Sequence, residues 1–297
     1  MKQPRLLYPI LAFGVLCIAS SSVMIRLISD EANGLTVATY RTFLATLFLL
    51  PFFPRAWPEI RVLSPNHKRL VLLSGVMLGL HFVTWISSLY YTTVASSTVL
   101  VNTSPLFIAM ASFFILGERL HNRLLIGIIL GFLGASLMAF GDLSDKQFPH
   151  AAFGNGLAIL GMITVSGYMM AGRVVRQQGL SWLGYVFPVY FIAAVTVLIC
   201  SLLLQTNLVV SWTVLGICAL MALGPQIAGH GAMNYAVRYI PPAFVTLVIL
   251  VEPVLSSLMT FLLWGEKPST LSLFGMVVVL TGLIAALQGK AQMETND

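Results

Sequence analysis

Long apolar runs alternate with short polar breaks along the whole chain. A membrane-spanning helix needs about 20 apolar residues to cross a hydrocarbon core of about 30 Å. Ten runs of suitable length can be drawn, so the pattern predicts an all-α integral membrane protein with ten transmembrane helices. They lie at about residues 8–28, 35–53, 70–91, 94–116, 124–141, 153–172, 182–204, 212–237, 243–264 and 271–288.

The polar breaks predict where the helices end. Polar residues 29–34 close the first run, and the prolines at positions 51, 54, 58 and 65 predict a loop after the second. A polar stretch, Asp142–His150, lies near the middle of the chain. It predicts a division into two units, residues 1–147 and 148–297.

The second unit repeats the first. A shift of 148 residues aligns Tyr91–Phe140 with Tyr239–Gln288, and shared apolarity does not explain the coincident Pro, Gly-Glu, Gly and Gly. Each unit holds five runs, an odd number, so the second copy enters the membrane inverted. Inverted repeats are an architecture of secondary transporters, with the substrate site near the midplane. Identical pairs are Tyr91/Tyr239, Ala95/Ala243, Thr98/Thr246, Pro105/Pro253, Phe113/Phe261, Gly117/Gly265, Glu118/Glu266, Leu125/Leu273, Gly127/Gly275 and Gly134/Gly282.

Composition narrows the class of protein further. The chain is 58% hydrophobic and 9% charged, whereas soluble proteins have about 25% charged residues. The net charge of +6 comes from basic residues scattered singly, so we expect no nucleic-acid partner. The cysteines all lie in apolar runs and are expected to be buried thiols. They are Cys17, Cys200 and Cys218.

The N-terminus resembles a secretory signal, because Lys2 and Arg5 precede an apolar stretch that ends in small residues. Many apolar runs follow, so we expect this first run to remain as a membrane helix. A cytoplasmic N-terminus places most of the sixteen basic residues on the cytoplasmic side, in line with the positive-inside rule. We therefore expect a multi-pass protein of a bacterial inner or plasma membrane, with both termini cytoplasmic.

Glu252 is the one formal charge in the ninth run and lies near its middle, directly before Pro253. An intramembrane carboxylate usually faces a cavity or a partner and often relays protons. Burial favours the protonated carboxyl, which suits a proton carrier. The alternative is a protonated side chain that hydrogen-bonds a neighbouring helix. The repeat counterpart is Ser104, so the shared fold does not require the charge, and this favours function.

The eighth run carries Gln226, His230 and Asn234 at spacings of four, which puts them on one helical face. A polar stripe is costly in lipid, so it must face protein or water. Two interpretations remain open: a cavity wall that hydrogen-bonds a solute, or a polar lock between helices.

Further candidates lie in the first unit. The third run places His81 and Trp85 on one face, where an aromatic ring would stack on a planar or cationic ligand or serve as core packing. Asn102 and Ser104 lie deep in the fourth run as cavity donors. Arg41 in the second run would hold an anionic group, or snorkel, or pair with an acidic residue in the segment 30–31.

These features resemble the drug/metabolite transporter superfamily, EamA type. The resemblance rests on ten runs, two five-run repeats, the Pro…Gly-Glu frame, Arg41, and the sequence Gly224-Pro225-Gln226…Gly229-His230…Asn234-Tyr235. It implies a basket-like bundle with a central cavity between the halves, and alternating access. Members carry amino acids, nucleotide-type metabolites, vitamins and organic cations, so it implies no single substrate.

The chain contains no phosphate-cradling loop, metal cluster or catalytic set of the usual patterns, and we expect neither a cofactor nor a metal nor an enzyme. We expect the protein to be a secondary transporter. The family resemblance implies export of amino acids or related metabolites as the first hypothesis. Protons are the expected coupling ion, carried by Glu252. The expected partners are a small-molecule substrate and the bilayer, and oligomeric state is not predicted. The alternatives are an uncoupled facilitative carrier, a channel and an intramembrane enzyme.

Overall fold

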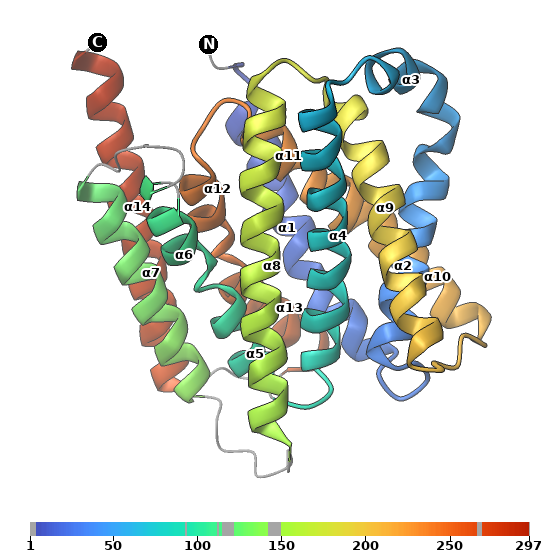
Figure 1. Ribbon diagram of the computed structural model, residues 1–297. Helices are drawn as coiled ribbons and strands as arrows, with labels where there is room; N and C mark the ends of the chain where they lie inside the picture. Colours follow the sequence, from blue (N-terminus) through green and yellow to red (C-terminus); the bar gives the residue numbers. More distant parts are fainter. Residues whose placement is uncertain are drawn as a thin grey trace.

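The computed structural model describes residues 4–92, 94–111, 113–114, 122–141, 150–265 and 269–296. In these ranges the chain folds as helices that run roughly side by side in a bundle (Figure 1). Both ends of the chain lie on the same side of the bundle, which we call the terminal side. The other side is the opposite side. The predicted boundary at residues 147/148 and the Gly-Glu partners Glu118 and Glu266 lie outside the described residues.

The described helices lie along the predicted runs, and several runs are divided between two or three helical elements. The first half contains α1 (Leu7–Leu27), α2 (Gly34–Leu49), η1 (Leu50–Phe52), α3 (Phe53–Arg61), α4 (Pro65–Ser88), α5 (Val94–Val101), α6 (Ser104–Ala111) and α7 (Asn122–Gly141). The second half contains α8 (Ala151–Gln177), α9 (Trp182–Leu203), α10 (Trp212–Met221), η3 (Ala222–His230), α11 (Gly231–Ala236), α12 (Pro242–Ile249), α13 (Glu252–Trp264) and α14 (Thr270–Asn296).

Seven stretches of the described chain are long and apolar enough to cross a membrane, with shorter apolar helices at Asn122–Leu137 and Leu273–Ala285. With the α5–α6 segment they account for the ten predicted spans, so the all-α membrane fold is confirmed. Side-chain caps start several of these helices. The Asn33 side chain accepts from the Thr36 backbone N–H at 2.9 Å, and that of Ser181 accepts from Gly184 at 3.0 Å.

The segment after α2 differs from the prediction. A proline-rich loop was expected, but residues 50–61 form η1 and α3, a short helix on the terminal side (Figure 1). Pro51, Pro54 and Pro65 each stand in the first turn of a helix. A proline is tolerated there because the missing N–H has no helical partner. The loop prediction was therefore wrong because these prolines begin helices.

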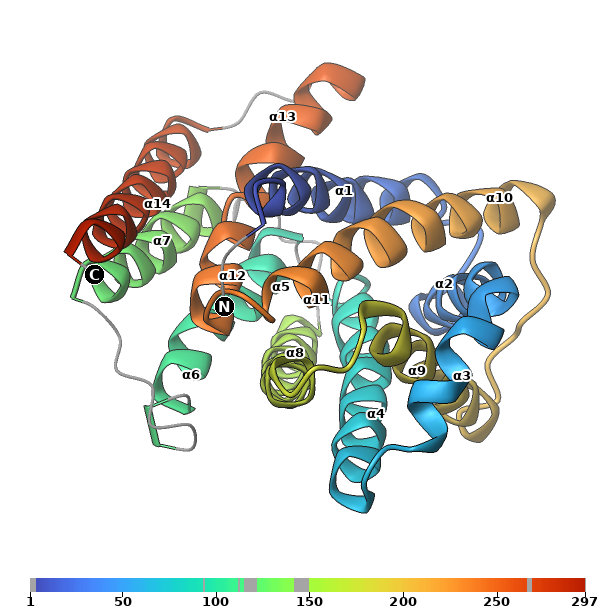
Figure 2. The same cartoon turned by 90° about the horizontal axis from the view of Figure 1, so that it is seen from above.

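The contact between α7 and α14 displays the symmetry of the repeat. The two helices lie side by side along much of their length (Figures 1 and 2). A Cβ added at Gly134 would lie 2.6 Å from the Gly275 carbonyl oxygen, and one at Gly282 would lie 2.7 Å from that of Gly127. The shift of 148 residues converts each contact into the other. The same close approach is made twice with the halves exchanged, as two inverted repeats require.

Two spans that were predicted as continuous helices are broken at equivalent places. Residues 102–103 separate α5 from α6, and residues 250–251 separate α12 from α13. Pro105 and Pro253 occupy the second position of the helices that follow. A proline gives up a backbone hydrogen bond and disfavours helical geometry in the residue before it. The shared proline therefore interrupts both spans at the same depth.

The eighth span is also irregular. Between α10 and α11 lies η3, a nine-residue π-helix that contains Pro225. Hydrogen bonds in a π-helix run from residue i to residue i+5, which widens the turn, and such segments are frequent at functional sites. The widened turn changes which side chains share a face, with consequences for the predicted polar stripe.

Candidate functional site

A small cavity lies between the two halves of the bundle, with a volume of about 50 Å³. One water molecule needs roughly 10–15 Å³ on this measure, whereas pockets for small organic ligands measure about 300–1,000 Å³. In this conformation the cavity is therefore too small for a metabolite. It is lined by Ile18, Ser21, Arg41, His81, Trp85, Thr98, Val101, Asn102, Ser104, Val165, His230, Met233, Thr246, Ile249 and Glu252.

Many lining residues are related by the repeat. A shift of 148 residues connects four pairs of them, so the pseudo-two-fold axis passes through the cavity. In two pairs the chemistry is alike, and in two it differs. The like pairs are Thr98/Thr246 and Val101/Ile249, and the unlike pairs are Ser104/Glu252 and Trp85/Met233.

Glu252 and Ser104 begin the second half of each broken span. Both side chains are buried, at 5% and 6% exposure, and both line the cavity. Each stands in the first turn of its helix, where unpaired N–H groups and the helix dipole favour negative charge. Glu252 Oε1 has no hydrogen-bond partner among the described residues. Discontinuous helices whose ends meet at the midplane are a feature of transporter binding sites.

Arg41 supplies a buried positive charge at the same cavity. It is 1% exposed, and its guanidinium donates from Nε to Gln226 Oε1 and from Nη1 to Ser21 Oγ, both at 3.0 Å. Its Cζ lies 4.4 Å from the centroid of the Phe82 ring. The interpretations of Arg41 as snorkelling or paired with an acidic residue of the segment 30–31 were wrong. Three neighbours from other helices hold the side chain inside the bundle instead.

Aromatic and imidazole rings form one wall. His81 stacks on Trp85 with ring centroids 5.7 Å apart and an interplanar angle of 2°. His81 Nδ1 donates to the Gly161 carbonyl oxygen at 3.0 Å, which fixes the ring. His230 meets Phe82 edge-on at 5.2 Å, and its Nδ1 is buried without a hydrogen-bond partner in the described chain. Of the two histidines, His230 is thus the one with an uncommitted ring nitrogen.

The predicted stripe on the eighth span is divided by the structure. Only His230 lines the cavity, while Gln226 turns to Arg41 and acts as a link between helices. The Asn234 amide lies by the buried Tyr168 hydroxyl without well-aligned hydrogen bonds. The spacing of four assumed an α-helix, and the π-helical segment η3 changes that register.

The structure adds residues that the sequence search passed over. Thr98 and Thr246, which occupy equivalent positions in the two repeats, both line the cavity. Ser21 of α1 lines it as well. The two threonines were visible as an identical pair in the repeat alignment, which was the available signal. Asn102, a predicted donor, lies at the break between α5 and α6, and its Nδ2 is buried without a partner in the described ranges.

Hydrogen bonds connect the spans on both sides of the cavity. On the terminal side, Arg173 Nη1 of α8 donates to the carbonyl oxygens of Val237 at 2.7 Å and Ile240 at 2.8 Å, just past α11. On the opposite side, the Tyr40 hydroxyl of α2 donates to the Leu208 carbonyl oxygen at 2.7 Å, between α9 and α10. Hydrogen bonds therefore join neighbouring elements near both ends of the bundle.

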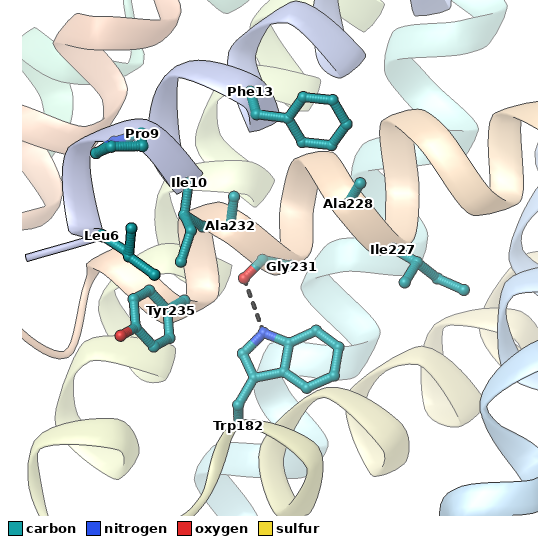
Figure 3. A pocket seen from close by; sticks show the side chains of 10 residues that line it. All are labelled: Leu6, Pro9, Ile10, Phe13, Trp182, Ile227, Ala228, Gly231, Ala232 and Tyr235. Atoms are coloured by element: carbon teal, nitrogen blue, oxygen red, sulfur yellow. Dashed lines mark hydrogen bonds between the residues drawn. The ribbon is translucent and has the colours of Figure 1, made fainter. Parts of the chain in front are cut away.

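A larger hollow of about 490 Å³ lies elsewhere, between α1, η3–α11 and the start of α9 (Figure 3). Its lining is almost entirely apolar and includes none of the predicted site residues. The smaller cavity is the candidate site because the uncommitted polar atoms of Asn102, His230 and Glu252 converge on it.

Comparison with known proteins identifies the family. The EamA-like transporter family matches residues 6–140 and again residues 152–288, almost the whole chain in two copies. The chain belongs to the EamA-like transporter family. It is therefore a multi-pass membrane protein that transports small molecules, and it is not an enzyme.

Relatives within this group differ in what their names say they carry. The chain is 24% identical over 280 residues to the pseudopaline exporter CntI of Pseudomonas aeruginosa strain UCBPP-PA14, covering 93% of this chain and 95% of that one. It is 22% identical over 274 residues to an S-adenosylmethionine uptake transporter of Rickettsia bellii, covering 88% and 86%. A crystal structure with 17% identity gives a TM-score of 0.77 over 96% of this chain and 98% of that chain, which supports the ten-helix fold alone.

Proposed function

We propose that this transporter exports a small amino-acid-like solute by alternating access, with Glu252 as the group that couples transport to protons. The observation that carries the proposal is that a carboxyl and a guanidinium, Glu252 and Arg41, line the same buried cavity on the axis between the repeats. An export direction is supported by the similarity to an exporter over nearly the full length of both chains.

The charges of the cavity suit a solute that has both an acid and an amine. Its carboxylate would face Arg41, whose described partners, Ser21 and Gln226, are neutral. Its ammonium would face Glu252, whose Oε1 has no partner in the described chain. The ring of Trp85 would cover an apolar or planar side chain. Each end of the solute thereby meets the opposite charge in a dry site.

Proton coupling follows because Glu252 can hold either the solute ammonium or a proton. The carboxylate faces the ammonium while the solute is bound, and it takes up a proton after the solute has left. Alternating access exposes the cavity to the terminal side and to the opposite side in turn. We place the terminal side in the cytoplasm, because the basic residues gather there. They include Arg55, Arg61, Lys68, Arg69, Arg123, Arg173, Arg176 and Arg238.

The test uses the protein reconstituted in liposomes with a panel of labelled amino acids and related metabolites, with and without a pH gradient. We expect one solute class to accumulate against its concentration gradient only when the pH gradient is present. Glu252→Gln should abolish that accumulation while exchange of labelled for unlabelled solute continues. Gradient-driven accumulation by Glu252→Gln at the wild-type level would disprove the coupling role, and failure to carry any amino-acid-like solute would disprove the substrate class.

An uncoupled facilitative carrier is the second candidate. It is favoured by the position of Glu252 in the first turn of α13, because a helix N-terminus stabilises an ionised carboxylate. A permanently ionised Glu252 would pair with the solute amine and carry no proton. In that case transport by the wild-type protein would not respond to the pH gradient, and Glu252→Gln would weaken binding of the solute instead.

A further inference from the structure

The larger, apolar groove has exposed lining residues such as Leu6 and Phe13, and none of its lining residues lines the solute cavity (Figure 3). α1 forms one edge of the groove, η3 and α11 form its middle, and Trp182 at the start of α9 forms the other edge. The Trp182 indole N–H donates to the Gly231 carbonyl oxygen at 2.8 Å, so its polar atom is already satisfied. The lining residues are Leu6, Pro9, Ile10, Phe13, Trp182, Ile227, Ala228, Gly231, Ala232 and Tyr235.

The surroundings of the groove limit what can fill it. Its volume is about 490 Å³, and its lining is dominated by carbon. Water needs two to four polar partners to be stable in a cavity, and this lining offers almost none. The helices that form the groove are membrane spans, so the medium beside it is the hydrocarbon of the bilayer. An acyl chain matches both the apolar lining and the surroundings.

Two basic residues stand close in sequence to lining residues at one end of the groove. Leu6 and Tyr235 lie together at the same end of the hollow (Figure 3). Arg5 directly precedes Leu6 and is exposed, and Arg238 follows Tyr235 by three residues. Arg238 is half-buried, and its Nε has no hydrogen-bond partner among the described residues. This end lies on the terminal side, where lipid headgroups would meet the bundle.

We propose that the groove binds an anionic phospholipid from the leaflet on the terminal side, with one acyl chain in the hollow and the phosphate between Arg5 and Arg238. Basic residues close to a membrane surface attract anionic headgroups, and the guanidinium geometry suits phosphate oxygens. The groove supplies the apolar contact that holds this lipid longer than its neighbours in the bilayer.

The bound chain would lie against the contact between α1 and the η3–α11 segment. A Cβ added at Gly14 of α1 would collide with the Ala232 Cβ, and one at Gly229 would lie 2.6 Å from Ile18 Cγ1. Gly231 faces the groove while the neighbouring His230 faces the cavity, so a single helix separates them. The lipid therefore supports α1 and α11 at the place where their backbones touch.

The test measures lipid binding to the full-length purified protein by native mass spectrometry, with phosphatidylglycerol compared against phosphatidylcholine of the same acyl chains. We expect the wild-type protein to retain one phosphatidylglycerol in preference to phosphatidylcholine. Arg238→Gln should weaken phosphatidylglycerol binding about fivefold, and Ala228→Leu, which fills the groove, should weaken binding of both lipids roughly tenfold.

Matched variants keep the result specific. Arg69→Gln removes an exposed basic residue on the terminal side, and Ala219→Leu enlarges a half-buried alanine of α10 outside the groove. Both should bind lipid as the wild type does, and all variants should unfold at similar temperatures. Equal binding of the two lipids by the wild type would overturn the proposal, as would equal losses in the groove variants and their matched controls.

Discussion

The α7–α14 contact and the central cavity both lie on the axis between the repeats, but they differ in how far equivalent positions of the two repeats carry the same residue. In the helix contact, Gly134 faces Gly275 and Gly282 faces Gly127, so the four close-packed glycines are two counterpart pairs of the repeat. In the cavity, the counterparts of Ser104 and Trp85 are Glu252 and Met233. The first region keeps the same residue in both halves, whereas the second keeps it at Thr98/Thr246 and changes it at these two positions.

The difference follows from what each region must do. Where two helix backbones approach within contact distance, any Cβ collides with a carbonyl oxygen, so glycine is needed in both copies. A cavity that binds an asymmetric solute gains from unlike groups at equivalent positions. The glycine pairs are therefore explained by packing, and the unlike pairs Ser104/Glu252 and Trp85/Met233 are the positions at which we expect the two halves to interact differently with a solute.

Removing the carboxyl should have the largest effect on transport. We expect Glu252→Gln to lower gradient-driven uptake roughly a hundredfold, because a buried intramembrane carboxyl has no substitute in this cavity. Ser104→Ala, at the equivalent position, should change uptake only about twofold, since it removes one neutral hydrogen bond. Initial rates in proteoliposomes measure both. Equal losses in the two variants would show that the asymmetry of this pair has no functional meaning.

The second unlike pair should affect affinity rather than coupling. Trp85→Ala should raise the half-saturating solute concentration roughly tenfold, because the ring contributes a large contact area and stacks on His81. Met233→Ala should raise it about threefold through lost apolar contact. Asn234→Ala should change it little, since Asn234 lies outside the cavity lining. An Asn234→Ala effect as large as that of Trp85→Ala would contradict the cavity as described.

The symmetric region should respond symmetrically. Gly134→Ala and Gly282→Ala should each destabilise the protein by about 1–3 kcal/mol, because each added Cβ would overpack the same kind of backbone contact. Gly216→Ala in α10 is the control, since a Cβ there meets nothing within 4 Å. The stabilities of the three variants are compared by unfolding each in detergent with heat or denaturant. Clearly unequal losses for Gly134 and Gly282 would argue against the two-fold relation of α7 and α14.

Much of the fold was predictable because the membrane imposes simple rules. Every backbone polar group in lipid must be satisfied within the span, so the long apolar runs had to be helices. The lengths of α1, α4 and α9 follow their runs to within a few residues, whereas α8 extends five residues beyond the predicted end at residue 172. Pro105 and Pro253 were identified as a repeated pair in the sequence. The two spans were nevertheless predicted to be continuous, because a proline in a sequence does not reveal whether it bends a helix or breaks it.

Placing the site residues depended on geometry that the chain order does not contain. Glu252, Arg41, His81, Trp85, Asn102, Ser104 and His230 were named from the sequence and do line one cavity. Their roles in binding and coupling stay predictions. Gln226 was misplaced because the π-helix η3 rotates its side chain toward Arg41, 185 residues earlier in the chain.

The sequence by itself determined the membrane class, the ten spans, the repeat and the intramembrane carboxyl, because apolar length, proline, glycine and charge act locally. Tertiary structure alone decided that Glu252, Arg41 and His230 meet at one cavity, that Gln226 holds Arg41, and that an apolar groove lies behind His230. These facts depend on the side chain that each helix presents to another, and helix rotation is set by packing across the whole bundle.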